Sequence, residues 1–200
     1  MKIFAAIQSF SYQVFSNIIH SNHIKSGETM SVTPTDVEHA VTNVDIIVSK
    51  GNAEGEITYA NPIFFKLAGY TQGEMLDQPH SIIRHPDMPK IIFKYLWDEL
   101  QSGKDVKAFV KNLSKDGGFY WVLAHVRVAN NPDGTLRNYV STRKGMSTAA
   151  RGVIEPLYKE LLAAEEAGGM DESLKVLESF LKDNGATLAT FNDAMQKIQA

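Results

Sequence analysis

Side chains that could bind a ligand or exchange a proton are concentrated in the segment 81–90, where an arginine, a histidine and a carboxylate stand among two prolines. Arg84, His85 and Asp87 lie within four positions of one another. Each proline disfavours helix at the residue before it, which keeps the segment extended or turned. Arginine can contact an anionic group with two hydrogen bonds, and histidine titrates near neutrality. The segment therefore indicates a ligand site. An Arg84–Asp87 ion pair and a histidine that makes only a local hydrogen bond remain alternatives.

The composition limits the classes of function that the chain can have. A formal net charge of -3 with mixed signs disfavours nucleic acid as a partner. The absence of cysteine excludes disulfides, thiolate metal sites and photochemistry that needs a thiol adduct. The sequence has no pairing of nucleophile and base, no metal-spaced cluster and no phosphate-binding glycine loop, so we expect neither an enzyme nor a metal site.

The N-terminal segment is free of charged residues from position 3 to 24, histidine being counted as neutral, but it does not read as a membrane span. Polar residues such as Gln8, Ser11 and Asn17 interrupt the apolar run. The apolar residues recur at helical spacing, which predicts an amphipathic helix that packs on the domain or against a second subunit. We therefore expect a cytoplasmic protein without a membrane span.

The middle of the chain alternates between strand and helix patterns. Asn61 precedes a proline and is expected to cap a short helix. Strands are predicted at 45–49, 56–59, 108–114, 119–129 and 136–143, with short helices after residue 61 and a longer helix at about 89–102. This order predicts an α+β fold, a five-stranded antiparallel sheet with helices on one face.

The region after residue 147 is helical in pattern and carries apolar stripes. Ile154, Leu157, Leu161 and Leu162 form the first stripe, and Gly168–Gly169 ends that helix. Asp171 and Thr190 are expected to cap two further helices. These helices either pack together on the preceding domain or offer their stripes to a partner.

Residues 40–146 resemble a PAS sensory domain, and in particular that of aerotaxis receptors. The resemblance rests on Asn61-Pro-Ile-Phe-Phe-Lys-Leu-Ala-Gly-Tyr-Thr71, on Gln78-Pro-His80, and on Arg84-His-Pro-Asp-Met-Pro-Lys90. It continues through Trp97, Lys111-Asn112, Lys115-Asp-Gly117 and Tyr120-Trp121-Val122. The chain thus divides into an N-terminal helix and linker at 1–39, a PAS sensor domain at 40–146 and a helical extension at 147–200.

The resemblance implies a sensor that binds FAD without a covalent link and reports redox, oxygen or energy state to a chemotaxis pathway. If the 200 residues are the whole protein, output is expected to pass to a separate transducer, whereas in a fragment the missing part would carry the output. A homodimer is also expected. The cofactor-binding residues that it implies are Arg84, His85, Asp87, Trp97, Asn112 and Asn61. Trp97 would form an aromatic wall and Asn112 would present its amide to the pyrimidine edge of the flavin. Ser141 and Arg143 are further candidates, but the register of their strand is ambiguous.

Strand parity taken from the family places Tyr120, Val122, Ala124 and Val126 toward the helices and Trp121 and Leu123 on the opposite face. The N-terminal helix or a second subunit is expected to cover this outer apolar patch.

Two other functions remain open on the same fold. One is a haem-binding gas sensor with His80, His85 or His125 as the axial ligand. The other is an interaction module that holds no cofactor.

Overall fold

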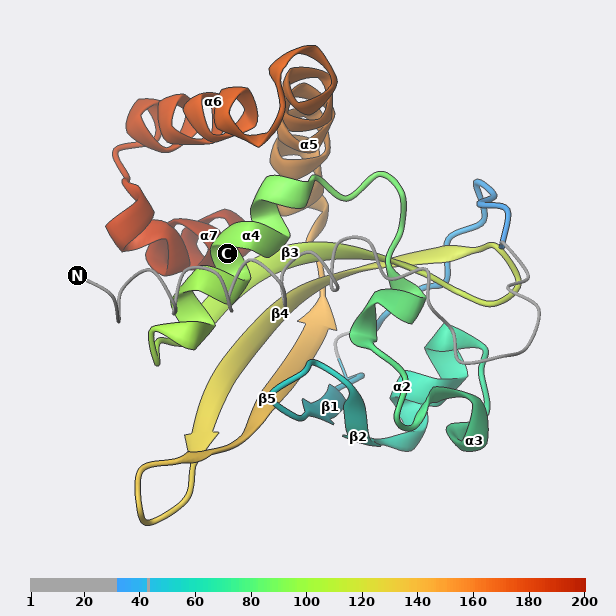
Figure 1. The fold of residues 1–200 in the computed structure, drawn as a ribbon. Coiled ribbons are helices and arrows are strands. Elements are labelled where there is room, and N and C mark those ends of the chain that lie inside the picture. The colour runs from blue at the N-terminus through green and yellow to red at the C-terminus, as the bar shows by residue number, and fades with distance from the viewer. Residues whose placement is uncertain (1–31, 43) are drawn as a thin grey trace.

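The computed structural model describes residues 32–42 and 44–200, so the amphipathic helix expected between residues 3 and 24 lies outside the described residues. The described chain is built on one antiparallel sheet (Figure 1). Its strands are β1 (Ile47–Gly51), β2 (Ile57–Ala60), β3 (Val106–Leu113), β4 (Phe119–Asn130) and β5 (Leu136–Gly145). They lie in the order β2-β1-β5-β4-β3. The predicted α+β fold with five antiparallel strands is confirmed.

Short helical elements connect β2 to β3, and the last two of them contribute to one wall of the pocket described below. They are α2 (Pro62–Ala68), α3 (Gln72–Met75), the 3-10 helix η1 (His80–Ile83) and α4 (Lys90–Gln101). Asn61 caps α2 as predicted: its Oδ1 accepts the N–H of Phe64 at 3.3 Å. Gly69 ends the helix in the left-handed region at φ 74°, where a residue without Cβ is favoured.

The two faces of β4 follow the predicted parity. Ala124 and Val126 line the pocket, and Tyr120 is fully buried. Trp121 points to the other face, where its ring centroid lies 5.9 Å from that of Tyr158. The parity implied by the family resemblance therefore assigned the inner and outer sides of this strand correctly.

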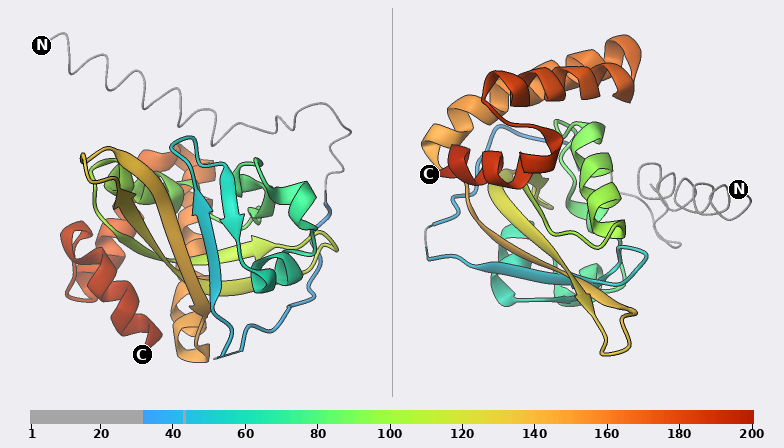
Figure 2. Two further views of the ribbon diagram at one scale, coloured as in Figure 1. Left: turned by 90° about the horizontal axis from the view of Figure 1, so that it is seen from below. Right: turned by 90° about the vertical axis from the view of Figure 1, so that its left-hand side faces the viewer.

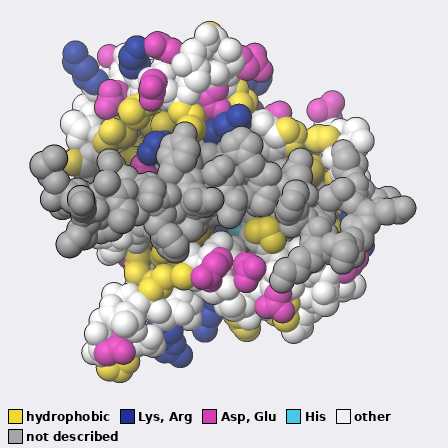
Figure 3. Space-filling view, in the orientation of Figure 1, with side chains coloured by type: hydrophobic (Ala, Val, Ile, Leu, Met, Phe, Trp, Pro, Cys, Tyr) yellow, Lys and Arg dark blue, Asp and Glu magenta, His cyan; other side chains and the backbone are white. Residues whose placement is uncertain are grey.

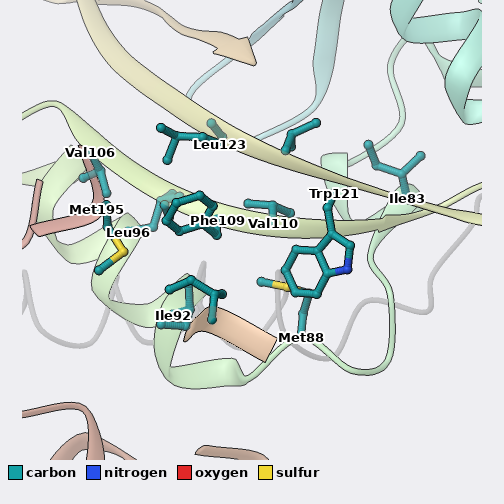
Figure 4. Close-up of a cluster of buried hydrophobic side chains, with 14 of the residues drawn as sticks. Ile83, Met88, Ile92, Leu96, Val106, Phe109, Val110, Trp121, Leu123 and Met195 are labelled. Atoms are coloured by element: carbon teal, nitrogen blue, oxygen red, sulfur yellow. The ribbon is translucent and has the colours of Figure 1, made fainter. Parts of the chain in front are cut away.

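The outer patch is covered by C-terminal helices of the chain, whereas the sequence predicted that the N-terminal helix or a second subunit would cover it. The C-terminal elements are α5 (Thr148–Gly168), α6 (Met170–Asp183), the 3-10 helix η2 (Leu188–Thr190) and α7 (Phe191–Gln199) (Figures 1 and 2). Of these, α5 and α7 lie against the sheet, and α6 packs on α5. Trp121 and Leu123 are both buried. Figure 4 shows Met195 of α7 in the same apolar cluster as Phe109 and Leu123. The C-terminal helices thus pack on the sheet as well as on one another.

The sequence pattern located these helices well but placed one cap wrongly. Ile154, Leu157 and Leu161 are buried along α5 as expected. The N-cap of α6 is Gly169, and Asp171, predicted as the cap, lies in the first turn instead. A carboxylate in the first turn still stabilises the positive end of the helix dipole.

The edge strand β3 is also protected by the C-terminal helices. Asn192 of α7 accepts the backbone N–H of Lys107 at 2.7 Å, and its amide donates to the carbonyl of Asp105 at 2.8 Å. Tyr158 of α5 donates its hydroxyl to the carbonyl of Phe109 at 2.7 Å. Side chains therefore occupy backbone groups that an edge strand would otherwise leave unpaired.

The surface over the C-terminal helices carries acidic and basic side chains in close alternation (Figure 3). Within residues 32–42 and 44–200, no helix has the length and apolar character needed to cross a membrane.

Candidate functional site

A pocket of about 960 Å³, its open mouth included, lies between the sheet and the helical elements that follow β2. The lining is mainly apolar, with a few polar groups that point inward, which is typical of cofactor sites. It comes from β1, η1, α4 and the three long strands. The polar and aromatic lining residues include Ser49, His80, Arg84, Phe93, Trp97, Asn112, Tyr139, Ser141 and Arg143.

Three of the six residues singled out from the sequence meet in this pocket. Arg84, Trp97 and Asn112 line it, although they come from a loop, a helix and a strand. His85, Asp87 and Asn61 do not line it. The structure therefore brings three of these residues together at one pocket, while the other three have different surroundings.

Arg84 is held at the pocket by its neighbours on both sides. Its backbone forms an isolated bridge with Asn112, and its guanidinium lies 4.4 Å from the ring centroid of Phe93. Its Nη2 donates to the carbonyl of Met88 at 3.3 Å. Burial lowers the pKa of Arg84, while the negative charge of Glu165 acts in the opposite direction. No Arg84–Asp87 ion pair forms.

Trp97 closes one end of the pocket with two close neighbours. Its ring meets the ring of Tyr139 edge-on, with centroids 5.3 Å apart. A Cβ added to Gly55 would lie 3.2 Å from the Trp97 ring, and Gly55 has φ +82°. Glycine is therefore favoured here both by its backbone conformation and by the closeness of the indole.

Asn112 and Ser141 each leave a buried polar atom without a protein partner among the described residues. These atoms are Asn112 Nδ2 and Ser141 Oγ, and both residues are at least 95% buried. A buried polar group without a partner is unfavourable by about 1–3 kcal/mol. Because both residues line the pocket, a ligand with hydrogen-bonding groups would satisfy them.

A chain of hydrogen bonds crosses the floor of the pocket from Arg143 to Gly55. Arg143 Nη1 donates to Ser49 Oγ at 2.9 Å, and Ser49 Oγ lies 2.9 Å from His80 Nε2. His80 Nδ1 lies 3.0 Å from the carbonyl of Gly55. The carbonyl can only accept, so Nδ1 carries the proton and Nε2 accepts from the serine. Burial, and after it the positive charge of Arg143, lowers the pKa of His80 to about 4.

Arg143 brings a buried positive charge to the pocket without a carboxylate beside it. Burial lowers its pKa to about 10. Within the described residues (32–42 and 44–200), neither Arg143 nor Arg84 forms an ion pair. Buried charges are normally paired. Two arginines that line one pocket without a carboxylate in contact suit a ligand that carries negative charge.

The other three predicted residues have structural partners. Asn61 Oδ1 also accepts the N–H of Val48 at 3.0 Å. Asp87 pairs with Lys111 Nζ at 2.6 Å, and His85 Nδ1 accepts the N–H of Asp87 at 3.1 Å. His85 Nε2 is buried without a protein partner among the described residues, and its ring lies edge-on to Phe119 at 6.0 Å.

Sequence reasoning missed the connection between His80, Ser49 and Arg143. The signal was partly present, because Ser141 and Arg143 have the same parity and so share a face of β5. Ser141 and Arg143 face the pocket because β5 pairs in a register that places Arg143 opposite Ala124 and Ser141 opposite Ser49. These pairings join segments far apart in the chain, which a local pattern does not specify.

His80 is expected to make the folded protein less stable as the pH falls. The unfolded chain binds a proton at His80 near pH 6.5, whereas the folded protein does so only near pH 4. The unfolding free energy should therefore decrease between those pH values, by at most about 3 kcal/mol from this residue. We expect the unfolding free energy of His80→Gln to change less over this pH range than that of the wild type. Denaturant unfolding at a series of pH values measures it.

The matched control for this experiment is His125→Gln. His125 is half-exposed, and its Nε2 lies 3.5 Å from Asp105 Oδ2. Burial also lowers its pKa, but Asp105 opposes the shift. The control should change the slope of the unfolding free energy against pH less than His80→Gln does. Equal slopes in the wild type and in His80→Gln would contradict the lowered pKa of His80.

Comparison with known proteins identifies the middle of the chain. The model of the PAS fold family matches residues 57–143. The aerotaxis receptor of Escherichia coli (strain K12) is 36% identical over 135 residues, which are 68% of this chain and 26% of that protein. The nitrogen fixation regulatory protein of Klebsiella pneumoniae is 28% identical over 109 residues, or 54% of this chain and 22% of that protein. The chain thus spans about a quarter of the length of these relatives.

Among solved structures, the light state of the blue-light photoreceptor Aureochrome1 LOV matches with a TM-score of 0.46 and 23% sequence identity, covering 55% of this chain and 84% of that one. From the family match in sequence, residues 57–143 belong to the PAS fold family, in a domain similar to that of the aerotaxis receptor.

Proposed function

We propose that this chain is a signal-transduction sensor that binds FAD non-covalently and reports redox, oxygen or energy state to a chemotaxis pathway. The observation that carries the proposal is the chemistry of the pocket. Two arginines without a carboxylate in contact and two unsatisfied polar groups meet there beside aromatic rings. The similarity to the aerotaxis receptor supports the same assignment.

The residues of the pocket fit the parts of this cofactor. Asn112 and Ser141 would hydrogen-bond to polar edges of the ring system, and Trp97 would lie beside it. Arg84 and Arg143 would neutralise negative groups of the cofactor. We propose these five residues in place of the full set inferred from the sequence, with His85, Asp87 and Asn61 supporting the pocket from outside.

Bound FAD would supply a group that takes up electrons reversibly. The chain would hold this group away from solvent and set its affinity for electrons through the charge of Arg143 and the hydrogen bonds of Asn112 and Ser141. A change in those hydrogen bonds would alter the relative populations of two arrangements of the domain. This role needs no catalytic residue, so we propose a sensor and not an enzyme.

The haem alternative is less well supported by the three histidines. Both ring nitrogens of His80 are within hydrogen-bond distance of a partner. His85 and His125 do not line the pocket.

The test is the visible absorption spectrum of the purified protein before and after anaerobic reduction with dithionite, followed by identification of the released cofactor. We expect the two bands of oxidised flavin, their reversible loss on reduction, and FAD in the released fraction. A Soret band would support the haem sensor instead. A colourless protein that does not take up added FAD would support the interaction module and overturn the proposal.

The proposed setting is the cytoplasm, with a homodimer that passes its signal to a separate chemotaxis transducer. The similarity to the aerotaxis receptor supports signalling partners of this kind. The division into a linker at 1–39, a sensor domain at 40–146 and an extension at 147–200 is part of the same proposal. Light scattering of the full chain would test the dimer, and a mass equal to one chain would contradict it.

A further inference from the structure

Helix α4 stands between the pocket and the C-terminal helices and contacts both. Phe93, Trp97 and Leu100 of α4 line the pocket. Away from the pocket, Tyr95 donates its hydroxyl to the carbonyl of Leu188 at 2.8 Å, and its ring centroid lies 4.6 Å from that of Phe191. Leu96, which lines the pocket, and Met195 of α7 belong to the same buried apolar cluster (Figure 4). A shift of α4 would therefore alter the pocket and the C-terminal helices together.

The N-terminus of α4 is completed by a residue of α5. Its N-cap is Pro89, which makes no side-chain cap, and its first turn holds no acidic residue. Glu165 Oε1 accepts the backbone N–H of Ile91 at 2.8 Å across 74 positions of sequence. This carboxylate satisfies one of the free N–H groups that begin a helix and lies at the positive end of the helix dipole.

The same carboxylate acts on a cation of the pocket. Arg84 lies above the ring of Phe93 in the first turn of α4, and the charge of Glu165 attracts its guanidinium. Their charged groups are not within ion-pair contact, so Arg84 stays available to a group in the pocket. An anionic ligand at Arg84 and the carboxylate of Glu165 would share one positive charge and repel each other.

We propose that Glu165 is a positioning residue through which negative charge in the pocket is communicated to the C-terminal helices. This inference rests on the proposed function, because it takes FAD as the anionic ligand. An anion bound at Arg84 repels the carboxylate of Glu165 and so weakens its hydrogen bond to the N–H of Ile91 at the N-terminus of α4. Because coupling between two sites is reciprocal, loss of the Glu165 charge strengthens binding of the anion. The helical extension is then the output element of the sensor.

The experiment compares Glu165→Gln with wild type for two ligands, FAD and riboflavin, which share a ring system but differ in the phosphates. Glutamine keeps an acceptor oxygen for the N–H of Ile91 and removes only the charge. We expect Kd for FAD to fall about three- to tenfold, near the lower end of typical couplings between sites. Kd for riboflavin should stay within about twofold of its wild-type value, because no phosphate charge is present.

The matched control is Glu166→Gln, which removes the same charge from the neighbouring exposed residue. It should leave both dissociation constants within about twofold of wild type. A purely structural role of Glu165 would change the affinity for both ligands by the same factor. Equal changes for FAD and riboflavin, or no change for either, would overturn the inference.

A second measurement needs no ligand and separates this inference from the proposed function. A double-mutant cycle of Glu165→Gln and Arg84→Gln, followed by denaturant unfolding, measures the coupling between the two charges. We expect the effects on the unfolding equilibrium constant to be non-additive by about twofold or more. If the protein bound neither flavin, the proposed function would fail, and a non-additive cycle would still support communication between Glu165 and the pocket. An additive cycle would overturn it.

Discussion

Replacing Arg143 with methionine should weaken FAD binding by about 30-fold or more, because the variant loses a charged hydrogen-bond donor worth about 2–3 kcal/mol. The same change should leave the ligand-free protein as stable as before or make it more stable. Burial lowers the pKa of Arg143 to about 10, so its positive charge is less favourable in the pocket than in water. Apolar replacement of buried charged groups is often neutral or stabilising.

The opposite signs of the two effects make this prediction specific. Ser49 loses the donation from Arg143, but its hydroxyl can still donate to His80 Nε2, so the substitution leaves that imidazole paired. Flavin titration measures the affinity, and denaturant unfolding without flavin measures the stability. Lys144→Met, which removes an exposed charge one residue further along β5, is the control and should change neither quantity markedly. A variant with unchanged FAD affinity would show that Arg143 does not serve the ligand.

Leu161→Ala is expected to destabilise the whole described domain by about 2–5 kcal/mol, because the substitution leaves a cavity in a closely packed interior. Leu161 is fully buried on the stripe of α5 that packs toward the sheet. The sheet, the pocket and the C-terminal helices should unfold in a single transition.

The two tryptophans make this measurable by fluorescence during denaturant unfolding. Trp97 borders the pocket, and Trp121 lies beside Tyr158 of α5 on the other face of the sheet. Glu160→Ala alters an exposed residue of the same helix and should have an effect within about 0.5 kcal/mol. A separate early transition that leaves the signal of Trp97 unchanged would contradict the single folding unit.

The sequence allowed the strands to be predicted because they follow from short-range patterns. The faces of β4 were assigned from the family resemblance, and the alternation of side chains along a strand then separates Ala124 from Trp121. Arg84, Trp97 and Asn112 were predicted as site residues from a resemblance that aligns them with known PAS motifs, and all three line the pocket.

What the sequence did not reveal depends on contacts between distant segments. Asp87 stands three positions after Arg84, yet its carboxylate pairs with Lys111 of β3. The outer patch around Trp121 needed a cover, and an apolar stripe does not specify which of several amphipathic helices will provide it. The capping of α4 by Glu165 likewise joins residues 74 positions apart.

The hydrogen bonds that Asn192 and Tyr158 make to β3 and its N-terminal flank have a consequence for shortened versions of this chain. An exposed edge strand is a template on which another polypeptide can add a strand, and chains with free edges tend to aggregate. A version that ends before Phe191 would lose Asn192 and so free the N–H of Lys107 and the carbonyl of Asp105. A chain without the last helix should therefore self-associate through β3, so an oligomer of such a fragment would not represent the assembly of the full chain.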